Sequence, residues 1–303
     1  MIRHTLFRSL RRLGRDHSTL RPAVKICSRI LLGFYAGGAR SVTSEEMYRA
    51  LLSELNIVPQ LQWQQHIDDI FTDRSLVDAF YPNSSPSAEA PAAWKERVYR
   101  IVGHATLYYA LVREMKPNIA VETGTASGGY TALILAAMHK NKKGRLISID
   151  IPPVKGTLTM STTVSPDRIG HLIPECYKYR WDYREGDAKF LLPKVLQENE
   201  VDLFIHDSLH TRTHMLFEYS TARALLKEGS IIASDDILWN GVFDQFLSIV
   251  RLYGYSPLED PGIGAFVNKY SWSEKKNTFR NYASTSINRS DHATPFDART
   301  DPD

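Results

Sequence analysis

The chain has 303 residues, of which 43% are hydrophobic and 23% are charged. This composition is typical of a globular protein and excludes a fibrous or largely disordered one. The two cysteines, Cys27 and Cys176, exclude a disulfide framework and a cysteine metal cage. No apolar run approaches the roughly 20 residues of a membrane-spanning helix. We therefore predict a cytoplasmic protein with one large α/β domain and appendages, or two small domains.

Positive charge is concentrated at the N-terminus. Residues 1–43 hold nine Lys or Arg and one acid, so they carry +8 and leave −5 of the overall +3 for the remainder. We interpret residues 1–42 as a basic arm that is solvated, packs on a partner, contacts a membrane surface or directs the chain to an organelle. The acidic body argues against a large phosphate-contacting surface, so nucleic acid is not the expected partner.

Helical patterns precede the main domain. We interpret 43–95 as a helical extension and a lid over the site, with expected helices at 43–56 and 61–71. A loop rich in Pro and Ser follows at 81–93. A long helix over 94–115 then leads into the first strand.

Residues 118–129, NIAVETGTASGG, organise the rest of the chain. A short apolar run ends in Glu122, a glycine-rich turn follows, and 130–138 is predicted to be helical. Strand, glycine-rich turn and helix form the first half of a nucleotide-binding βαβ unit. Glycine is needed there because a cofactor can approach the backbone only where no Cβ intervenes. The pattern alone also fits a dinucleotide site, another adenosyl-cofactor site or a simple tight turn.

Strands and helices alternate from 118 to 250. The further strands are expected at 146–149, 183–186, 201–205, 230–233 and 264–268. The alternation predicts a doubly wound, mostly parallel, Rossmann-like α/β sheet of seven strands within a domain over 96–270. The polar, patternless residues 271–303 are predicted to be a disordered tail.

Acids follow three of these strands: Asp150, Asp207, and the pair Asp235 and Asp236. Ligands of open α/β sheets bind beyond the carboxyl ends of the strands. Asp150 stands 22 residues after Gly128, which suits a contact with the ribose hydroxyls of an adenosine. The alternative is a strand-end acid that caps a turn.

The other three acids suggest a metal. Asp207, Asp235 and Asp236 would repel one another in one crevice unless a cation were present, and Asp oxygens suit Mg²⁺. The alternative is that one of them caps a helix and another faces water. His210, three residues after Asp207, can take a proton from a hydroxyl group, whereas His214 is assigned a structural role.

The stretches VETGTASGG, LISID, GDA, VDLFIHDSLHT and LLKEGSIIASDD carry a specific resemblance. In order and spacing they are similar to class I S-adenosylmethionine-dependent methyltransferases over about residues 95–270. Within that fold the chain resembles the metal-dependent small-molecule O-methyltransferases, the group of the macrolide sugar O-methyltransferases and the cephalosporin-hydroxylase-like proteins. Asp-x-x-His followed by an acidic pair is more selective than the glycine turn.

The resemblance implies roles for individual residues. Asp150 would hold the ribose, and Asp187 would lie by the adenine. Asp207, Asp235 and Asp236 would bind Mg²⁺, and His210 would be the general base. The cofactor-binding set would comprise Glu122, Gly124, Thr125, Ala126, Ser127, Gly128, Asp150, Asp187 and Asp207. The macrolide relatives tend to have Glu where this chain has Asp235.

These observations predict an S-adenosylmethionine-dependent, Mg²⁺-assisted O-methyltransferase. The acceptor would be a hydroxyl of a sugar, a polyketide or a phenol, with Trp239 and Asn240 as candidate contacts, and the chain could form a homo-oligomer. The alternatives are a hydroxylase-like or otherwise diverged member of the fold, a nucleic-acid methyltransferase guided by the basic arm, and an NAD-type oxidoreductase. The oxidoreductase alternative is disfavoured because this chain lacks a full G-x-G-x-x-G motif.

Overall fold

A computed structural model describes residues 44–80, 105–151, 164, 166–257 and 262–269. The predicted basic arm, the loop at 81–93 and the tail at 271–303 lie outside these residues, as does the beginning of the helix expected at 94–115. None of the described helices is long and apolar enough to cross a membrane.

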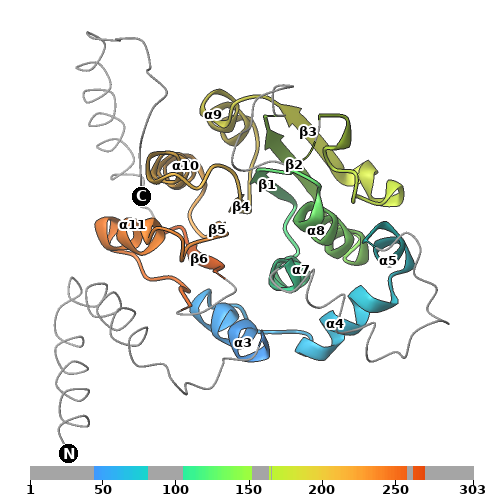
Figure 1. The fold of residues 1–303 in the computed structure, drawn as a ribbon. Helices are drawn as coiled ribbons and strands as arrows, with labels where there is room; N and C mark the ends of the chain where they lie inside the picture. Colours follow the sequence, from blue (N-terminus) through green and yellow to red (C-terminus); the bar gives the residue numbers. More distant parts are fainter. Residues whose placement is uncertain (1–43, 81–104, 152–163, 165, 258–261, 270–303) are drawn as a thin grey trace, which may run out of the picture.

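One sheet organises the described residues (Figure 1). Its strand order is β3-β2-β1-β4-β5-β6; neighbours are parallel except β5 and β6, which are antiparallel. The strands are β1 (Ile119–Thr123), β2 (Arg145–Asp150), β3 (Trp181–Glu185), β4 (Leu203–His206), β5 (Ile231–Ser234) and β6 (Gly264–Val267). The predicted α/β class and parallel pairing are confirmed. Six strands, rather than the predicted seven, lie within the described residues.

Helices cover both faces of the sheet (Figure 1). On one face lie α7 (Ala105–Met115) and α8 (Gly129–Lys140), packed over an apolar core shared with the N-terminal helices. On the other lie α9 (Ala188–Glu198), α10 (Arg212–Leu225) and α11 (Val242–Val250), which enclose a second core. Two short 3₁₀ helices, η1 (Pro166–Arg168) and η2 (Glu175–Arg180), precede β3. This two-sided cover is what buries a parallel sheet.

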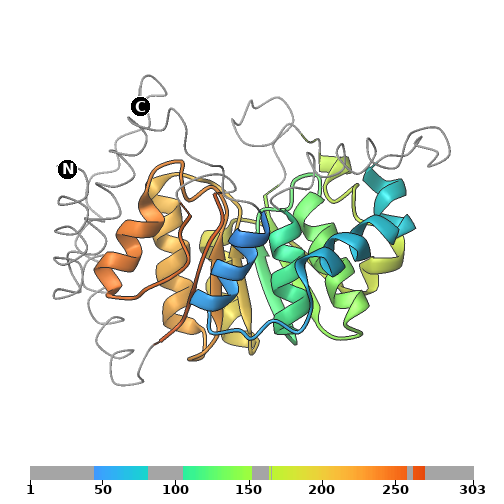
Figure 2. The same cartoon turned by 90° about the horizontal axis from the view of Figure 1, so that it is seen from below.

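The helical extension lies against α7 and α8 (Figure 2). It contains α3 (Ser44–Glu54), α4 (Trp63–Thr72) and α5 (Arg74–Phe80). The sequence analysis missed α5, although Asp73 signals it: the Asp73 carboxylate accepts hydrogen bonds from the backbone N–H groups of Ser75 and Leu76.

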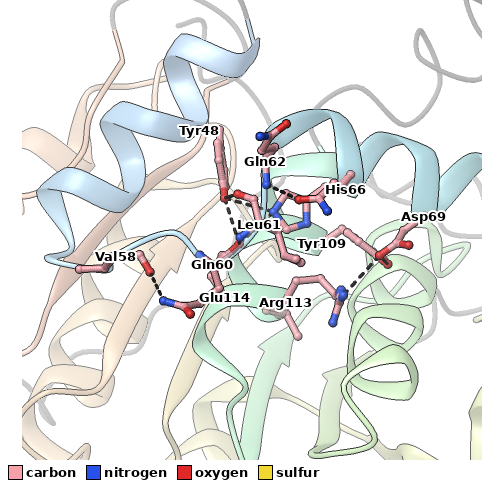
Figure 3. A network of polar contacts seen from close by, with 12 residues as sticks. Tyr48, Val58, Gln60, Leu61, Gln62, His66, Asp69, Tyr109, Arg113 and Glu114 are labelled. Atoms are coloured by element: carbon pink, nitrogen blue, oxygen red, sulfur yellow. Dashed lines mark hydrogen bonds and ion pairs between the residues drawn. The ribbon is translucent and has the colours of Figure 1, made fainter.

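A buried carboxylate, Glu114 of α7, joins this extension to the domain (Figure 3). It accepts a hydrogen bond from the Tyr48 hydroxyl at 3.0 Å and lies 3.1 Å from Nε2 of His66. The backbone N–H groups of Gln60 and Leu61 donate to it at 2.7 and 3.1 Å. Because α3, α4 and the intervening loop all bond to one buried group, 44–80 is anchored to α7. The lid interpretation stays a prediction.

Candidate active site

The glycine-rich turn is wedged between the ends of β2 and β4. Gly124 has φ +88°, and a Cβ on it would lie 1.9 Å from the backbone oxygen of Asp207, so no other residue fits there. Gly128 also has a positive φ, +86°, and begins α8. The predicted turn is therefore present and in direct contact with the segment that follows β4.

Asp150 shapes this turn. Its Oδ2 atom accepts hydrogen bonds from the backbone N–H groups of Thr125 and Ala126, both at 2.9 Å. These bonds hold Ala126 at φ +46°, a conformation that side chains rarely adopt. One oxygen of Asp150 therefore caps the turn, as the alternative interpretation of this residue predicted. The ribose contact predicted for this residue stays a prediction.

Glu122 is buried behind the turn. Its Oε1 atom accepts hydrogen bonds from the hydroxyls of Thr131 and Ser148, both at 2.6 Å. The indole N–H of Trp181 donates in turn to the Ser148 hydroxyl at 2.7 Å. Burial raises the pKa of Glu122 to about 7. This carboxyl group therefore ties β1 to β2, β3 and α8, close to the turn that it was predicted to shape.

Asp187 caps α9. Its carboxylate accepts a hydrogen bond from the backbone N–H of Lys189 at 2.8 Å. The preceding Gly186 donates its N–H to the backbone oxygen of Asp150 at 2.9 Å, which brings the ends of β2 and β3 together. The predicted contact of Asp187 with adenine stays a prediction.

The acids after β4 and β5 come together as the parallel register requires. His206 pairs with Ser234, and the backbone N–H of Asp235 donates to the oxygen of His206. Asp235 is buried, and its side chain shares a hydrogen bond with Asp207. Burial, and then the charge of Asp235, raise the pKa of Asp207 well above its ordinary value. Two of the three predicted metal ligands are therefore direct neighbours.

Asp236 departs from this pair. It has φ +49° and its carboxylate is half exposed. Its Oδ2 atom lies 3.8 Å from Nδ1 of His210. Within the described ranges, no group of three or more His, Cys, Asp or Glu side chains is arranged so that it could hold a metal ion. The binding of Mg²⁺ by Asp207, Asp235 and Asp236 stays a prediction.

His210 lies between the two acidic strand ends. Its Nε2 atom is 3.9 Å from Asp207 and its Nδ1 is 3.8 Å from Asp236, both beyond hydrogen-bonding distance. Nε2 is buried and has no hydrogen-bond partner among the described residues. Burial, followed by the nearby His206, lowers the pKa of His210. The neutral imidazole that this favours can accept a proton.

Two exposed apolar side chains flank this position. Leu209 is 48% exposed and Trp239 is 75% exposed. The side-chain amide of Asn240 donates to the backbone oxygen of His210 at 2.9 Å, so the two loops that carry these side chains lie side by side. The role of Trp239 and Asn240 as acceptor contacts stays a prediction.

Glu218 of α10 was not singled out by the sequence analysis. This fully buried carboxylate lies beneath the β4–α10 loop and contacts Thr123, His206, Ser208 and His214. The predicted structural role of His214 is consistent with its bond to Glu218 at 2.7 Å. One signal was available: His214 and Glu218 are four residues apart, the spacing of neighbours on one helix face.

Residues 121–237 match the family model described as "Methyltransferase domain". The matched stretch begins in β1, contains the glycine turn and His210, and ends just after Asp236. This part of the chain therefore resembles a methyltransferase domain. The predicted enzyme class is confirmed.

Solved structures include similar methyltransferases. One is the Podospora anserina methyltransferase PaMTH1 bound to SAH, 16% identical, with 77% of this chain and all of that chain covered and a TM-score of 0.42. Another is CalS11, a TDP-rhamnose 3′-O-methyltransferase of calicheamicin biosynthesis, 16% identical, with 75% and 96% covered and a TM-score of 0.43. A third is the Bacillus cereus O-methyltransferase, 14% identical, with 67% and 96% covered and a TM-score of 0.39.

No curated protein matches this chain.

The methyltransferase domain offers unsatisfied polar groups to a cofactor. The hydroxyl of Thr125, in the turn, and that of Tyr183, on β3, are buried and find no hydrogen-bond partner among the described residues. Buried polar groups are normally paired. Together with the close backbone approach at Gly124, they fit a ligand that carries several polar groups and lies across the ends of β1 and β3.

Proposed function

We propose that this protein is an S-adenosylmethionine-dependent O-methyltransferase that acts on a hydroxyl of a small molecule such as a sugar, a polyketide or a phenol, with His210 as general base. The observation that carries the proposal is the position of His210 within the methyltransferase domain. It lies at the carboxyl ends of β4 and β5, beside the segment that packs on the glycine turn, with a buried and unpartnered Nε2.

S-adenosylmethionine would supply an electrophilic methyl group. Thr125 and Tyr183 would donate to or accept from its polar groups, and Asp150 would use its remaining oxygen for the ribose. The surrounding wall would be formed by the other predicted cofactor residues: Glu122, Gly124, Ala126, Ser127, Gly128, Asp187 and Asp207. These residues would hold donor and acceptor within reach of each other, which is the main contribution of such a site.

His210 would accept the proton of the acceptor hydroxyl, while the cofactor would supply the methyl group and leave as its neutral thioether. The lowered pKa of His210 keeps the imidazole available as a base near neutral pH. Once protonated, the ring would lie within 4 Å of two carboxylates, those of Asp207 and Asp236, which stabilise the positive charge. No other observation favours the hydroxylase-like, oxidoreductase or nucleic-acid alternatives.

The proposal is tested with His210→Gln. Calorimetry should give the same affinity for S-adenosylmethionine in both proteins, and no binding of NAD(H). Transfer of a labelled methyl group to a panel of phenols, catechols and simple sugars should fall by roughly 10²–10⁴-fold in the variant, the contribution typical of a general base. Equal transfer by the two proteins, or binding of NAD(H) instead of S-adenosylmethionine, would contradict the proposal.

The predicted magnesium ion is tested separately, since the proton transfer above does not depend on it. Binding would require the hydrogen bond between Asp207 and Asp235 to open. Titration with MgCl₂ in the presence of S-adenosylmethionine should give heat that is lost in Asp235→Asn if the ion binds there. The metal prediction would be wrong if the protein without substitutions bound no Mg²⁺ in this titration.

A further inference from the structure

We infer that Glu218 is a positioning residue of the active site: its buried carboxylate fixes the β4–α10 loop, and through that loop it sets the place of His210. The inference rests on the proposed function of His210. It extends that function to a residue that lies 8 positions away in the sequence and does not itself contact the reacting groups.

The Glu218 carboxylate is hydrogen-bonded to side chains of β1, β4, α10 and the β4–α10 loop. It accepts from the Thr123 hydroxyl of β1 at 2.5 Å and from the Ser208 hydroxyl of the loop at 3.0 Å. It lies 2.6 Å from Nδ1 of His206 at the end of β4 and 2.7 Å from Nε2 of His214 on α10. Residues before, within and after the segment 207–210 (His206, Ser208 and His214) are therefore bonded to the Glu218 carboxylate.

The hydrogen bonds also fix which atom carries a proton. An ionised carboxylate can only accept, so Nδ1 of His206 must donate to it. The hydrogen bonds from His206 and His214 lower the pKa of Glu218 to about 2 despite its burial, which keeps it ionised at neutral pH. The rotation of the His206 ring is thereby set.

The His206 ring in turn supports His210. The two ring centroids are 5.2 Å apart with an interplanar angle of 76°, an edge-to-face contact. The position of His210 is thus supported by the contact with the His206 ring and by the hydrogen bond from Ser208, in the same loop, to Glu218. Neither His206 nor Glu218 reaches the surface, since both are fully buried. They can affect catalysis only through His210, by their charges near its ring and by placing it. Misplacement of a reacting group by about 1 Å can cost about a hundredfold in rate.

The test uses the full chain labelled with ¹⁵N in its histidines. Glu218→Gln keeps the shape of the side chain but removes the charge. Glu114→Gln is the matched control, since Glu114 is also a buried carboxylate with four partners, one of them a histidine, in another part of the fold. We expect the ring signals of His206, His214 and His210 to shift in Glu218→Gln and that of His66 to stay. Glu114→Gln should move His66 and leave His210 unchanged.

Methyl transfer gives the second readout. With an acceptor that the unchanged protein methylates, kcat of Glu218→Gln should fall about tenfold to a hundredfold, with KM and S-adenosylmethionine affinity within threefold. Glu218→Asp, which keeps the charge, should recover part of kcat. If Glu218→Gln does not fold, Ser208→Ala can replace it. This change removes only the hydrogen bond from the loop to Glu218 and should still shift the ring signal of His210.

The outcomes separate the two claims. His210 signals that stay in place in both Glu218→Gln and Ser208→Ala would overturn the positioning role, whatever the activity. His210 signals that move while His210→Gln retains full activity would uphold the positioning and reject the proposed base.

Discussion

Two buried carboxylates, Glu114 on α7 and Glu218 on α10, each have four hydrogen-bonding partners in different parts of the molecule. Glu114 bonds to helices and a loop of the N-terminal extension and contacts no candidate site residue (Figure 3). Glu218 bonds to strand ends and to the loop that carries Asp207 and His210. The same chemistry thus serves attachment of an extension in one place and placement of reactive groups in the other.

The difference lies in what each carboxylate holds. The partners of Glu114 belong to elements that also bury Leu51, Leu52, Trp63 and other apolar side chains, so the hydrogen bonds add to a hydrophobic contact. The partners of Glu218 include Ser208 of a short loop whose apolar side chain, Leu209, is exposed. Loss of Glu114 should therefore appear as lost stability, and loss of Glu218 as lost activity as well.

The largest effect on stability is expected for Glu114→Leu. This change leaves the Tyr48 hydroxyl, the His66 ring and two backbone N–H groups without their acceptor, at about 1–3 kcal/mol for each buried group that water cannot reach. We expect the free energy of unfolding to fall by about 4 kcal/mol, measured with urea. Methyl transfer per folded molecule should not change. A variant that is stable but inactive would break the distinction between the two carboxylates.

The acid side of the stability profile should report Glu218. Its pKa is about 2 in the folded protein against an ordinary value of 4.5. The stabilisation is therefore complete above pH 4.5 and is lost as the pH falls toward 2, by about 3 kcal/mol in total. Urea unfolding between pH 6 and pH 2.5 should show this loss, and Glu218→Gln should show a shallower slope. Equal slopes in the two proteins would mean that the carboxylate is not held as described.

Glu122 should give a dependence of the opposite sign. Burial raises its pKa to about 7 from 4.5. Its contribution to stability is therefore fully present below pH 4.5 and is lost as the pH rises through 7, again by about 3 kcal/mol in total. In Glu122→Gln, the free energy of unfolding should vary less between pH 5 and pH 8. An identical pH profile would contradict the raised pKa that burial gives this carboxyl group.

The smallest effect is expected for Tyr48→Phe. It removes a hydroxyl that bonds to Glu114, to the backbone oxygen of Leu61 and to Nε2 of His66, and it leaves the apolar packing of the ring on Trp63 in place. The cost should be about 1–2 kcal/mol, the net value of one or two hydrogen bonds. Thr123→Val makes the matching change at Glu218 and should cost a similar amount. A much larger activity loss in Thr123→Val than in Tyr48→Phe would sharpen the comparison.

Much of the sheet follows from local patterns. Apolar runs such as those at 146–149 and 201–205 are short and bounded by turns, so the strands β2 and β4 could be placed within about two residues. The short helix α5 was missed because seven residues hold too little periodic pattern, even with the cap at Asp73. Seven strands were predicted but residues were assigned to only six, and these six form the sheet of the described residues.

The candidate site was only partly predictable. Asp207 and the pair Asp235 and Asp236 could be brought together from sequence because parallel strands place their carboxyl ends at one edge. The sequence could not say that Asp235 would bond to Asp207 while Asp236 would lie beside His210. Those choices depend on side-chain directions and on the left-handed backbone at Asp236.

The alternation of strands and helices, the glycine turn and the acids at the strand ends follow from the amino-acid sequence, because they depend on residue type and short-range spacing. Which carboxylates are buried, and what they bond to, follows from the packing of the folded chain. Glu114 is over 50 residues from Gln60 and Leu61, and Glu218 is 95 residues from Thr123. Contacts across such separations arise from packing and leave no periodic trace along the chain, which is why both networks became visible only in the folded molecule.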